Sequence, residues 1–370
     1  MTTLAKAAVL RTAGTAPVIE QISVEAPRAD EVLVEIRGVG VCHTDMVMRD
    51  GHLPVPLPVV LGHEGSGVIR AVGSDVTGLA EGDHVVLSFM SCSHCPSCED
   101  DEPAYCHNWF ALNFFGTRAD GSTALSDAAG QRIHSHVFGQ SSFASHAVVN
   151  QRNVIRVDKD LPIELLGPLG CGIQTGAGAV LNSCQVRAGS SVAVIGTGAV
   201  GLSAIMAAQL AQARTVVALD INDARIALAL ELGATHGFRA DQATYPEHAA
   251  AAGCPAGFDT IIDTTGLTDL VNQAIGALAP RGQIALVGAY SPGAPAGADP
   301  THLMSGGRVI RGVVEGSADP KTFIPQLIEF YRQGRFPFDR LVQYFDFSDI
   351  VEAIEAGESG RVIKPVLRLP

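Results

Sequence analysis

Four of the eight cysteines in this 370-residue chain lie within one short segment. Cys92, Cys95, Cys98 and Cys106 follow the spacing C-x2-C-x2-C-x7-C. Steps of three residues bring neighbouring thiolates around one point, and a short loop returns the fourth thiolate to it. Four thiolates in a tetrahedral array suit Zn²⁺ and leave no open coordination position. The spacing therefore predicts a structural zinc lobe at about residues 88–115.

Three alternatives compete with zinc at these cysteines. Lys6 and Arg11 interrupt any apolar run at the N-terminus, so we expect no signal peptide and a cytoplasmic location. Disulfides are rare in cytosolic proteins. The spacing C-x2-C-x2-C also occurs at iron–sulfur clusters, although no other feature of the chain indicates electron transfer. His94 or His107 could replace one cysteine as a ligand.

A second set of metal-ligand residue types is spread along the chain. Cys42, the adjacent pair His63 and Glu64, and Cys171 lie far apart in sequence. One imidazole and two thiolates on Zn²⁺ give a neutral site with a fourth position free, which is typical of a catalytic metal rather than a structural one. Because a buried cysteine is often only a small apolar residue, spacing alone leaves this ligand set open.

A glycine-rich turn follows the apolar sequence VAVI and opens a predicted helix. Gly196 would allow a tight turn, Gly198 the approach of a pyrophosphate, and Gly201 the packing of helix on strand. Asp220 ends the next predicted strand, where it can bind both hydroxyls of an adenosine ribose and would repel a 2′-phosphate. The motif favours NAD over NADP; the alternative is a βα turn without nucleotide, with Asp220 as a strand-end cap. The full turn reads Gly196-Thr197-Gly198-Ala199-Val200-Gly201.

The elements that must position these residues are of two kinds. Residues 1–150 contain short alternating strands separated by Gly, Pro and Asp, typical of a barrel-like or sandwich-like β body. From about residue 173, strands and helices alternate, which predicts a doubly wound parallel sheet. The uncharged segment 188–213 is long enough to span a membrane, but it divides into a β-rich half and an alanine-rich helical half. We therefore expect a buried strand and a packed helix there.

The charge excludes some partners. The chain has 25 Lys+Arg against 38 Asp+Glu, a net charge of −13, and no basic run. We therefore expect neither nucleic acid nor a membrane as partner.

The motifs together resemble those of the zinc-dependent medium-chain alcohol dehydrogenases, and the resemblance runs from end to end. Residues 62–76, GHEGSG-x5-G-x2-V, are similar to the family's zinc signature, and the cysteine lobe and glycine turn follow in the family's order. The resemblance implies a two-domain α/β fold. Residues 1–172 and 315–370 would form a GroES-like, β-rich catalytic domain, and 173–314 an inserted Rossmann domain that binds NAD. It also implies two zinc ions per chain and a homodimer or homotetramer.

The resemblance further implies roles around the open metal site. Cys42, His63 and Cys171 would be the catalytic zinc ligands, and Glu64 would lie beside the metal and move toward it during ligand exchange. Asp45 would accept the other N–H of His63 and fix its tautomer.

Proton transfer departs from the family pattern. Thr44 would take the proton of the alcohol, but Val47 stands where the family has the next histidine of the relay. The proton would therefore leave through the nicotinamide ribose and water or another base. His43 is expected near the coenzyme pyrophosphate, and His52 is a spare candidate or an exposed loop histidine.

The remaining coenzyme contacts also come from the resemblance. Arg225 would lie near the adenosine ribose and Lys364 near the pyrophosphate. Thr175 and the turn Val287-Gly288-Ala289 would contact the nicotinamide.

The substrate pocket is expected to be apolar. The family's glutathione-dependent formaldehyde branch has an arginine four residues after the last lobe cysteine, where this chain has Phe110. The segments 37–50, 170–182 and 334–342 resemble the aryl (benzyl) alcohol dehydrogenase branch. The residues that could line a slot for a ring, or could simply belong to the core, are Val47, Trp109, Phe110, Val137 and Phe138.

The expected function is the reversible oxidation of a primary alcohol, aromatic or allylic, to the aldehyde, by hydride transfer from a zinc-bound alkoxide to NAD. The rivals are an aliphatic, secondary-alcohol or polyol dehydrogenase of the same family, a zinc-free relative like the quinone reductases, and a non-catalytic protein that senses NAD or zinc.

Overall fold

The computed structural model describes residues 2–291, 293–295 and 297–370, which form two compact units. Unit 1 comprises the chain up to Cys171 together with Asp319–Gln326 and Asp339–Pro370, and unit 2 comprises Gly172–Ala318 and Leu327–Phe338. The sequence placed all of 315–370 in the first domain, whereas residues 315–318 and 327–338 belong to unit 2. Residues 315–318 belong to unit 2 because two of their side chains form hydrogen bonds with that unit: Gln174 donates to Glu315, and the hydroxyls of Ser183 and Ser317 bond each other.

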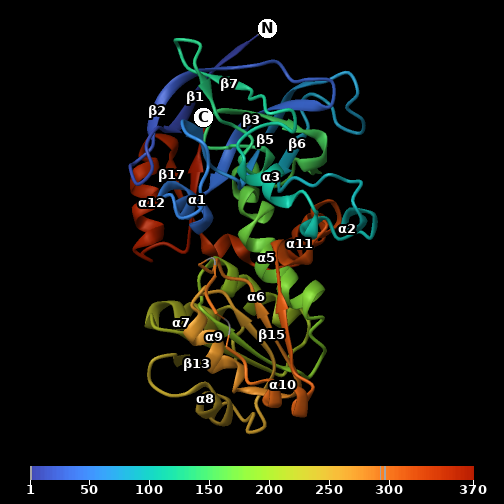
Figure 1. The fold of residues 1–370 in the computed structure, drawn as a ribbon, viewed down its shortest axis with the longest axis vertical. Coiled ribbons are helices and arrows are strands. Elements are labelled where there is room, and N and C mark those ends of the chain that lie inside the picture. Colours follow the sequence, from blue (N-terminus) through green and yellow to red (C-terminus); the bar gives the residue numbers. More distant parts are fainter. Residues whose placement is uncertain (1, 292, 296) are drawn as a thin grey trace. The chain divides into compact units, whose positions relative to one another are not determined.

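Unit 1 contains two sheets of mainly antiparallel strands (Figure 1). The first has the order β4-β1-β2-β7-β8, and the second has the order β10-β6-β5-β3-β18-β17, with β9 also pairing with β3. Strand β3 pairs with β18, so one sheet joins the N-terminal part of the chain to its C-terminal end. The strands are β1 Thr3–Leu10, β2 Val18–Val24, β3 Glu31–Gly40, β4 Val59–Val60, β5 Gly65–Val72, β6 His84–Leu87, β7 Leu125–Ser126, β8 Arg132–Ile133, β9 His146–Asn150, β10 Val154–Val157, β17 Val342–Asp346 and β18 Lys364–Arg368.

Short helices connect the strands of unit 1 and carry several candidate residues. Helix α1 begins after Cys42, whose backbone N–H donates to the carboxylate of Asp45 at 3.2 Å. This hydrogen bond at the start of the helix helps to fix the first turn and thereby the position of Cys42. The helices of this unit are α1 His43–Arg49, α2 Pro96–Glu99, α3 Trp109–Phe114, α4 Ile163–Leu166 and α12 Ile350–Glu358; α11 Pro320–Arg332 is divided between the units.

Unit 2 is built on a parallel sheet of the order β13-β12-β11-β14-β15-β16. The chain crosses back at β11, between β12 and β14, so the carboxyl ends of these strands form a switch point of the kind where α/β proteins bind ligands. The segment 188–213 contains the buried strand β11 and then α6, as its composition predicted. The elements are β11 Ser191–Ile195, β12 Thr215–Asp220, β13 His236–Arg239, β14 Phe258–Asp263, β15 Leu278–Leu286, β16 Val309–Gly312, α5 Gly172–Gly178, α6 Ala199–Leu210, α7 Asp223–Glu231, α8 Tyr245–Ala251, α9 Thr268–Ile275 and α10 Pro300–Gly306.

Among the described residues, no helix combines the length and the apolar character that crossing a bilayer requires.

Candidate active site

Unit 1 brings together the second set of metal-ligand residues. The ligand atoms of Cys42, His63, Glu64 and Cys171 lie within 4.8 Å of one another, and all these side chains except that of Cys42 are buried. Cys42 precedes α1, His63 and Glu64 precede β5, and Cys171 ends the short turn after α4. Residues up to 129 positions apart in the chain thus meet at one point.

Hydrogen bonds set the orientation of the His63 ring. Its Nδ1 lies 2.9 Å from Oδ1 of Asp45, which also accepts the backbone N–H of Gly62 at 3.0 Å. Because Asp45 can only accept, Nδ1 carries the hydrogen and Nε2 keeps its lone pair. Nε2 is buried and has no hydrogen-bond partner among the described residues. A buried lone pair in a group of thiols is what a metal ligand requires, so these residues fit zinc.

The electrostatics of the cluster favour a thiolate at Cys42. The hydrogen bond with Cys171 and the positive charge of Lys364 hold the pKa of Cys42 well below its ordinary value. A thiolate rather than a thiol is the form that binds metal.

Glu64 is paired with Lys364, a contact that sequence reasoning missed. Nζ of Lys364 lies 2.9 Å from both carboxylate oxygens of Glu64 and 3.3 Å from the carbonyl oxygen of Val41. Both side chains are buried within unit 1, so the ammonium balances the charge of Glu64. The signal in the sequence was a lone lysine within the apolar strand sequence RVIKPVL. The expected contact of Lys364 with a pyrophosphate stays a prediction.

Aromatic rings pack against His63. The ring of Phe138 stacks on that of His63, with centroids 4.4 Å apart, and Trp109 meets Phe138 edge-on at 6.1 Å. Phe89 and Phe114, which sequence reasoning did not single out, pack against Trp109 and Phe138 respectively. We call Phe89, Trp109, Phe114 and Phe138 the aromatic cluster.

The other predicted pocket residues differ in position. Val137 is fully buried and Val47 half-buried, whereas Phe110 is 58% exposed and contacts Phe114. The inner face of α3 carries Trp109 and the buried Asn113. Phe110 follows Trp109 in the helix and therefore points in a different direction. Phe110 therefore lies at the surface and not beside His63.

Of the remaining residues of α1, Thr44 is half-buried in the first turn, while His43 and His52 are exposed. Both histidines lie near Asp50, whose pKa is lowered mainly by its bond to Arg49 and further by their charge.

The four lobe cysteines form a separate group. Their sulfur atoms lie within 4.8 Å of one another. Backbone amides donate to these sulfurs, from Cys92 to Cys106 at 3.3 Å and from His107 to Cys95 at 3.4 Å, and the latter bond lowers the pKa of Cys95. His94 bonds the carbonyl of Cys92 through its ring, so neither His94 nor His107 joins the ligand group. All eight cysteines lie among the described residues and none of them forms a disulfide, which argues against the disulfide alternative.

In unit 2, the glycine turn has the geometry that the motif predicts. Gly196 has a positive φ of 85°, and a side chain at Gly201 would collide with the carbonyl of Gly196. Open space surrounds the Cα of Gly198, and Ala199 and Val200 open α6. The backbone at this helix start is therefore accessible to an anion.

Asp220 lies beside this turn. Its Oδ2 accepts both the backbone N–H and the hydroxyl of Thr197 at 2.7 Å, and its Oδ1 accepts from the amide of Asn222 at 3.0 Å. Arg225, on α7, has a buried Nε without a hydrogen-bond partner among the described residues. The two residues expected at the adenosine ribose thus lie on consecutive elements, Asp220 at the end of β12 and Arg225 on α7.

The expected nicotinamide contacts lie on two other parts of unit 2. Thr175 is buried in α5, with its hydroxyl 3.5 Å from Glu315. The amides of Val287 and Gly288 donate to the carbonyl of Asp263, at 2.9 and 3.2 Å, so the turn follows directly on β15.

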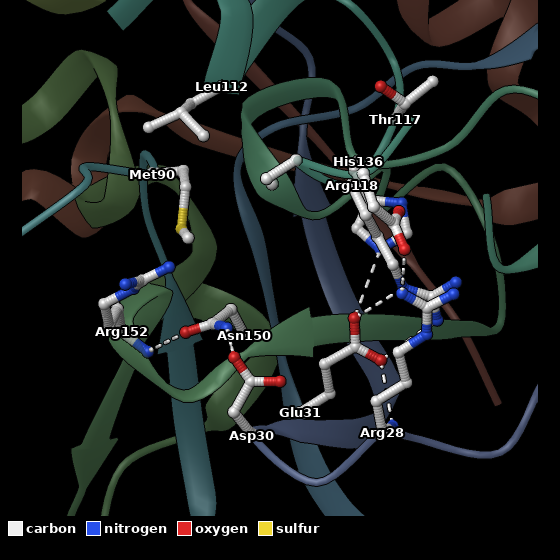
Figure 2. A pocket seen from close by; sticks show the side chains of 13 residues that line it. Arg28, Asp30, Glu31, Met90, Leu112, Thr117, Arg118, His136, Asn150 and Arg152 are labelled. Atoms are coloured by element: carbon white, nitrogen blue, oxygen red, sulfur yellow. Dashed lines mark hydrogen bonds and ion pairs between the residues drawn. The ribbon is translucent and has the colours of Figure 1, made fainter. Parts of the chain in front are cut away.

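A different cavity in unit 1 is lined by ionisable side chains, and Figure 2 shows how they pair. Arg118 bonds Glu31 through two nitrogens at 2.6 and 3.0 Å, and Arg28 bonds Asp120 at 2.7 Å. Nδ1 of the buried His136 lies 2.7 Å from the hydroxyl oxygen of Ser135. Because the charged groups Arg118, Glu31, Arg28 and Asp120 form ion pairs with one another, we assign the cavity a structural role.

His136 makes stability depend on pH. Burial and the charge of Arg118 lower its pKa to about 4, against about 6.5 in an unfolded chain. Between these values the unfolded chain binds more protons, so the free energy of unfolding falls as pH falls through this range, by up to about 3 kcal/mol. In His136→Asn the asparagine does not titrate, tolerates the left-handed backbone at φ 68° and can accept the Ser135 hydroxyl.

We expect urea unfolding at about pH 7 and about pH 4.5 to differ less in His136→Asn than in the wild type, by about 2–3 kcal/mol. The same pH dependence in both proteins would contradict this assignment.

The comparisons with known proteins agree with the geometry. Residues 28–159 match the alcohol dehydrogenase GroES-like domain, and residues 199–333 match the family model described as zinc-binding dehydrogenase. Geraniol dehydrogenase of Castellaniella defragrans is 49% identical over 98% of this chain and 97% of its own length. A probable alcohol dehydrogenase of a Pseudomonas species is 46% identical, over 75% of this chain and 88% of that protein.

Two solved structures are similar over the full length of both chains. A zinc-binding-domain alcohol dehydrogenase protein from Burkholderia ambifaria has a TM-score of 0.98 and 52% identity. Benzyl alcohol dehydrogenase from Acinetobacter calcoaceticus has a TM-score of 0.95 and 43% identity. The fold class and the resemblance inferred from the sequence are confirmed. This chain is an oxidoreductase of the zinc-dependent medium-chain alcohol dehydrogenase family, and its substrate is a small-molecule alcohol.

Proposed function

We propose that this enzyme oxidises a primary aromatic or allylic alcohol to the aldehyde and passes the hydride to NAD. The observation that carries the proposal is the cluster of two thiols and one imidazole in which Asp45 bonds Nδ1 of His63, while the buried Nε2 has no hydrogen-bond partner in the part of the chain that the structure describes.

Two zinc ions fit the residues present. Cys42, His63 and Cys171 would hold one, with Glu64 beside them, and the four lobe cysteines would hold the other. Two thiolates balance the charge of the first ion and leave one coordination position free. A zinc ion held by these residues would supply a Lewis acid to an alcohol oxygen at the free coordination position and make the alcohol proton easier to remove.

The chain's own residues would orient the reactants and move the proton. Asp45 keeps the His63 ring in one tautomer, and Thr44, two residues after Cys42, would accept the alcohol proton on its hydroxyl. Because Val47 has no titratable group, the proton would then leave through the coenzyme ribose and water.

The aromatic cluster supports a substrate with a flat apolar group next to its hydroxyl. Phe138 covers one face of the His63 ring, and Trp109 meets Phe138 at right angles, so a planar carbon skeleton can pack beside the metal ligands. The similarity to a geraniol and a benzyl alcohol dehydrogenase points in the same direction. Apolar surroundings of this kind would favour a ring over a short chain by a few kcal/mol, so the preference is graded.

For the coenzyme, the negative charge of Asp220 beside the glycine turn supports NAD rather than NADP. Arg225 would lie at the adenosine ribose, His43 and Lys364 near the pyrophosphate, and Thr175 and Val287–Ala289 at the nicotinamide. We further propose that the enzyme forms a homodimer or a homotetramer.

A substrate panel with NADH absorbance as readout tests the function. We expect benzyl alcohol and geraniol to give kcat/KM values about 10–100-fold above those of ethanol and sorbitol. Faster turnover of sorbitol or a secondary alcohol would favour the rival dehydrogenases. A zinc content near zero would favour the zinc-free relative, and a lack of NADH production with every alcohol would favour a sensing protein.

Val47→His tests how the proton leaves. A histidine at this position would offer a base of pKa about 6.5, so we expect kcat to gain an inflection between about pH 6 and pH 7.5 and to rise about tenfold at neutral pH. Val47→Leu is the matched control because it changes the size of the side chain without adding a titratable group. If Val47→His had the pH–rate profile of the wild type, the missing histidine would not limit this enzyme.

A further inference from the structure

Asp263 is a buried carboxylate at the carboxyl end of β14, the strand next to β11. It is fully inaccessible to solvent, and it has no ion-pair partner among the described residues. Its Oδ2 accepts the hydroxyl of Tyr290 at 2.5 Å, and its Oδ1 accepts the hydroxyl of Thr265 at 2.8 Å. Burial raises the pKa of Asp263 in spite of these donors.

The backbone and the side chain of Asp263 both accept hydrogen bonds from the segment 287–290. Its carbonyl accepts the amides of Val287 and Gly288, and its carboxylate bonds Tyr290. Both ends of the segment 287–290 are thus hydrogen-bonded to Asp263. Gly288 packs so closely on the amide of Gly266 that a side chain there would collide with it.

The same strand end is joined to the glycine turn. The amide and hydroxyl of Thr264 donate to the carbonyl of Ile195 at 3.0 Å, and the hydroxyl also donates to the carbonyl of Gly196 at 2.9 Å. The loops that follow β11, β14 and β15 are therefore connected at the sheet edge where proteins of this class bind their ligands.

The stability of the fold does not explain a carboxylate at this place. Burying a charge without a cation is costly, and an apolar pair of similar size would be the cheaper way to fill the space. Buried polar pairs of this kind can serve instead to fix one conformation. The conformation that Asp263 fixes is that of the 287–290 backbone.

We propose that Asp263 and Tyr290 are positioning residues that hold the backbone of Val287–Ala289 in the form that binds the nicotinamide half of the coenzyme. The inference rests on the proposed function, in which a nicotinamide dinucleotide binds at this edge. It predicts that losing the Tyr290 hydroxyl weakens binding of the nicotinamide half and leaves binding of the adenosine half intact.

The test compares two ligands on the full-length holoenzyme, NADH and ADP-ribose, by calorimetric titration. ADP-ribose contains the adenosine, the pyrophosphate and the second ribose but no nicotinamide. In Tyr290→Phe we expect the Kd of NADH to rise about tenfold and that of ADP-ribose to stay within about twofold, because one hydrogen bond to a charged group is lost. Tyr245→Phe is the matched control, since the Tyr245 hydroxyl belongs to the same core, is buried and has no partner among the described residues.

Asp263→Asn is a second variant, which keeps polar contacts to both hydroxyls; we expect its Kd for NADH to stay within about threefold of the wild-type value. Equal loss of both ligands in Tyr290→Phe, or no loss of either, would overturn the inference. A wild-type enzyme that bound neither ligand would overturn the proposed function as well, so the two failures are distinguishable.

Discussion

Replacing Cys42 with serine should lower kcat/KM for the best alcohol by at least about a thousandfold and remove one of two zinc ions. Serine does not supply a thiolate, so only His63 and Cys171 remain as strong ligands, and the Lewis acid that activates the alcohol is lost. A catalytic metal contributes several kcal/mol to transition-state stabilisation, and each 1.36 kcal/mol corresponds to about a factor of ten in rate. The measurements are metal content per chain by mass spectrometry and steady-state NADH production.

The control for this variant is Cys254→Ser. Cys254 is buried but belongs to neither metal cluster, and its thiol lies 3.8 Å from the carbonyl of Ala252, an acceptor that a serine can also use. We expect it to keep two zinc ions and full activity. If Cys42→Ser lost its zinc and still turned over at the wild-type rate, the mechanism proposed above would be wrong.

Replacing Asp220 with glycine is expected to change the ratio of kcat/KM for NAD to that for NADP by about a hundredfold or more, in favour of NADP. The carboxylate would lie against the 2′-phosphate of NADP, and like charges held together in an interface cost several kcal/mol. The glycine variant also loses the two bonds from Thr197, so we expect the KM for NAD to rise.

Asp220→Asn separates these two effects. Its side-chain oxygen can still accept from Thr197, but the negative charge is gone. We therefore expect Asp220→Asn to gain activity with NADP while it keeps more of its NAD affinity than Asp220→Gly does. A coenzyme ratio that stayed the same in both variants would show that Asp220 does not contact the ribose.

Parts of the site could be predicted because their residues are close together in the chain. Cys92, Cys95 and Cys98 are three residues apart, and the covalent chain alone keeps them near one another. The glycine turn is likewise local: Gly196 and Gly201 are five residues apart, and the backbone requires a residue without a side chain at both. The alternation of strands and helices after residue 173 predicted the parallel sheet for the same reason.

Other parts followed only from the resemblance to a known family. Nothing in the spacing of Cys42, His63 and Cys171 brings them to one point, since their approach depends on how β3, β5 and the turn after α4 pack. Packing also decides the exposure of neighbouring residues. Trp109 contacts Phe138 whereas Phe110 lies at the surface, and the place of Phe110 in a substrate slot stays a prediction.

The sequence by itself determined the residue types, two local motifs and the order of strands and helices, because these depend on neighbours in the chain. Only the tertiary structure decided which distant side chains meet. The pairing of Lys364 with Glu64, the stacking of Phe138 on His63 and the bond from Tyr290 to Asp263 join residues that lie 300, 75 and 27 positions apart. Such contacts form where burial removes water and buried polar groups must find their partners within the protein, and that condition is set by the packing of the whole unit.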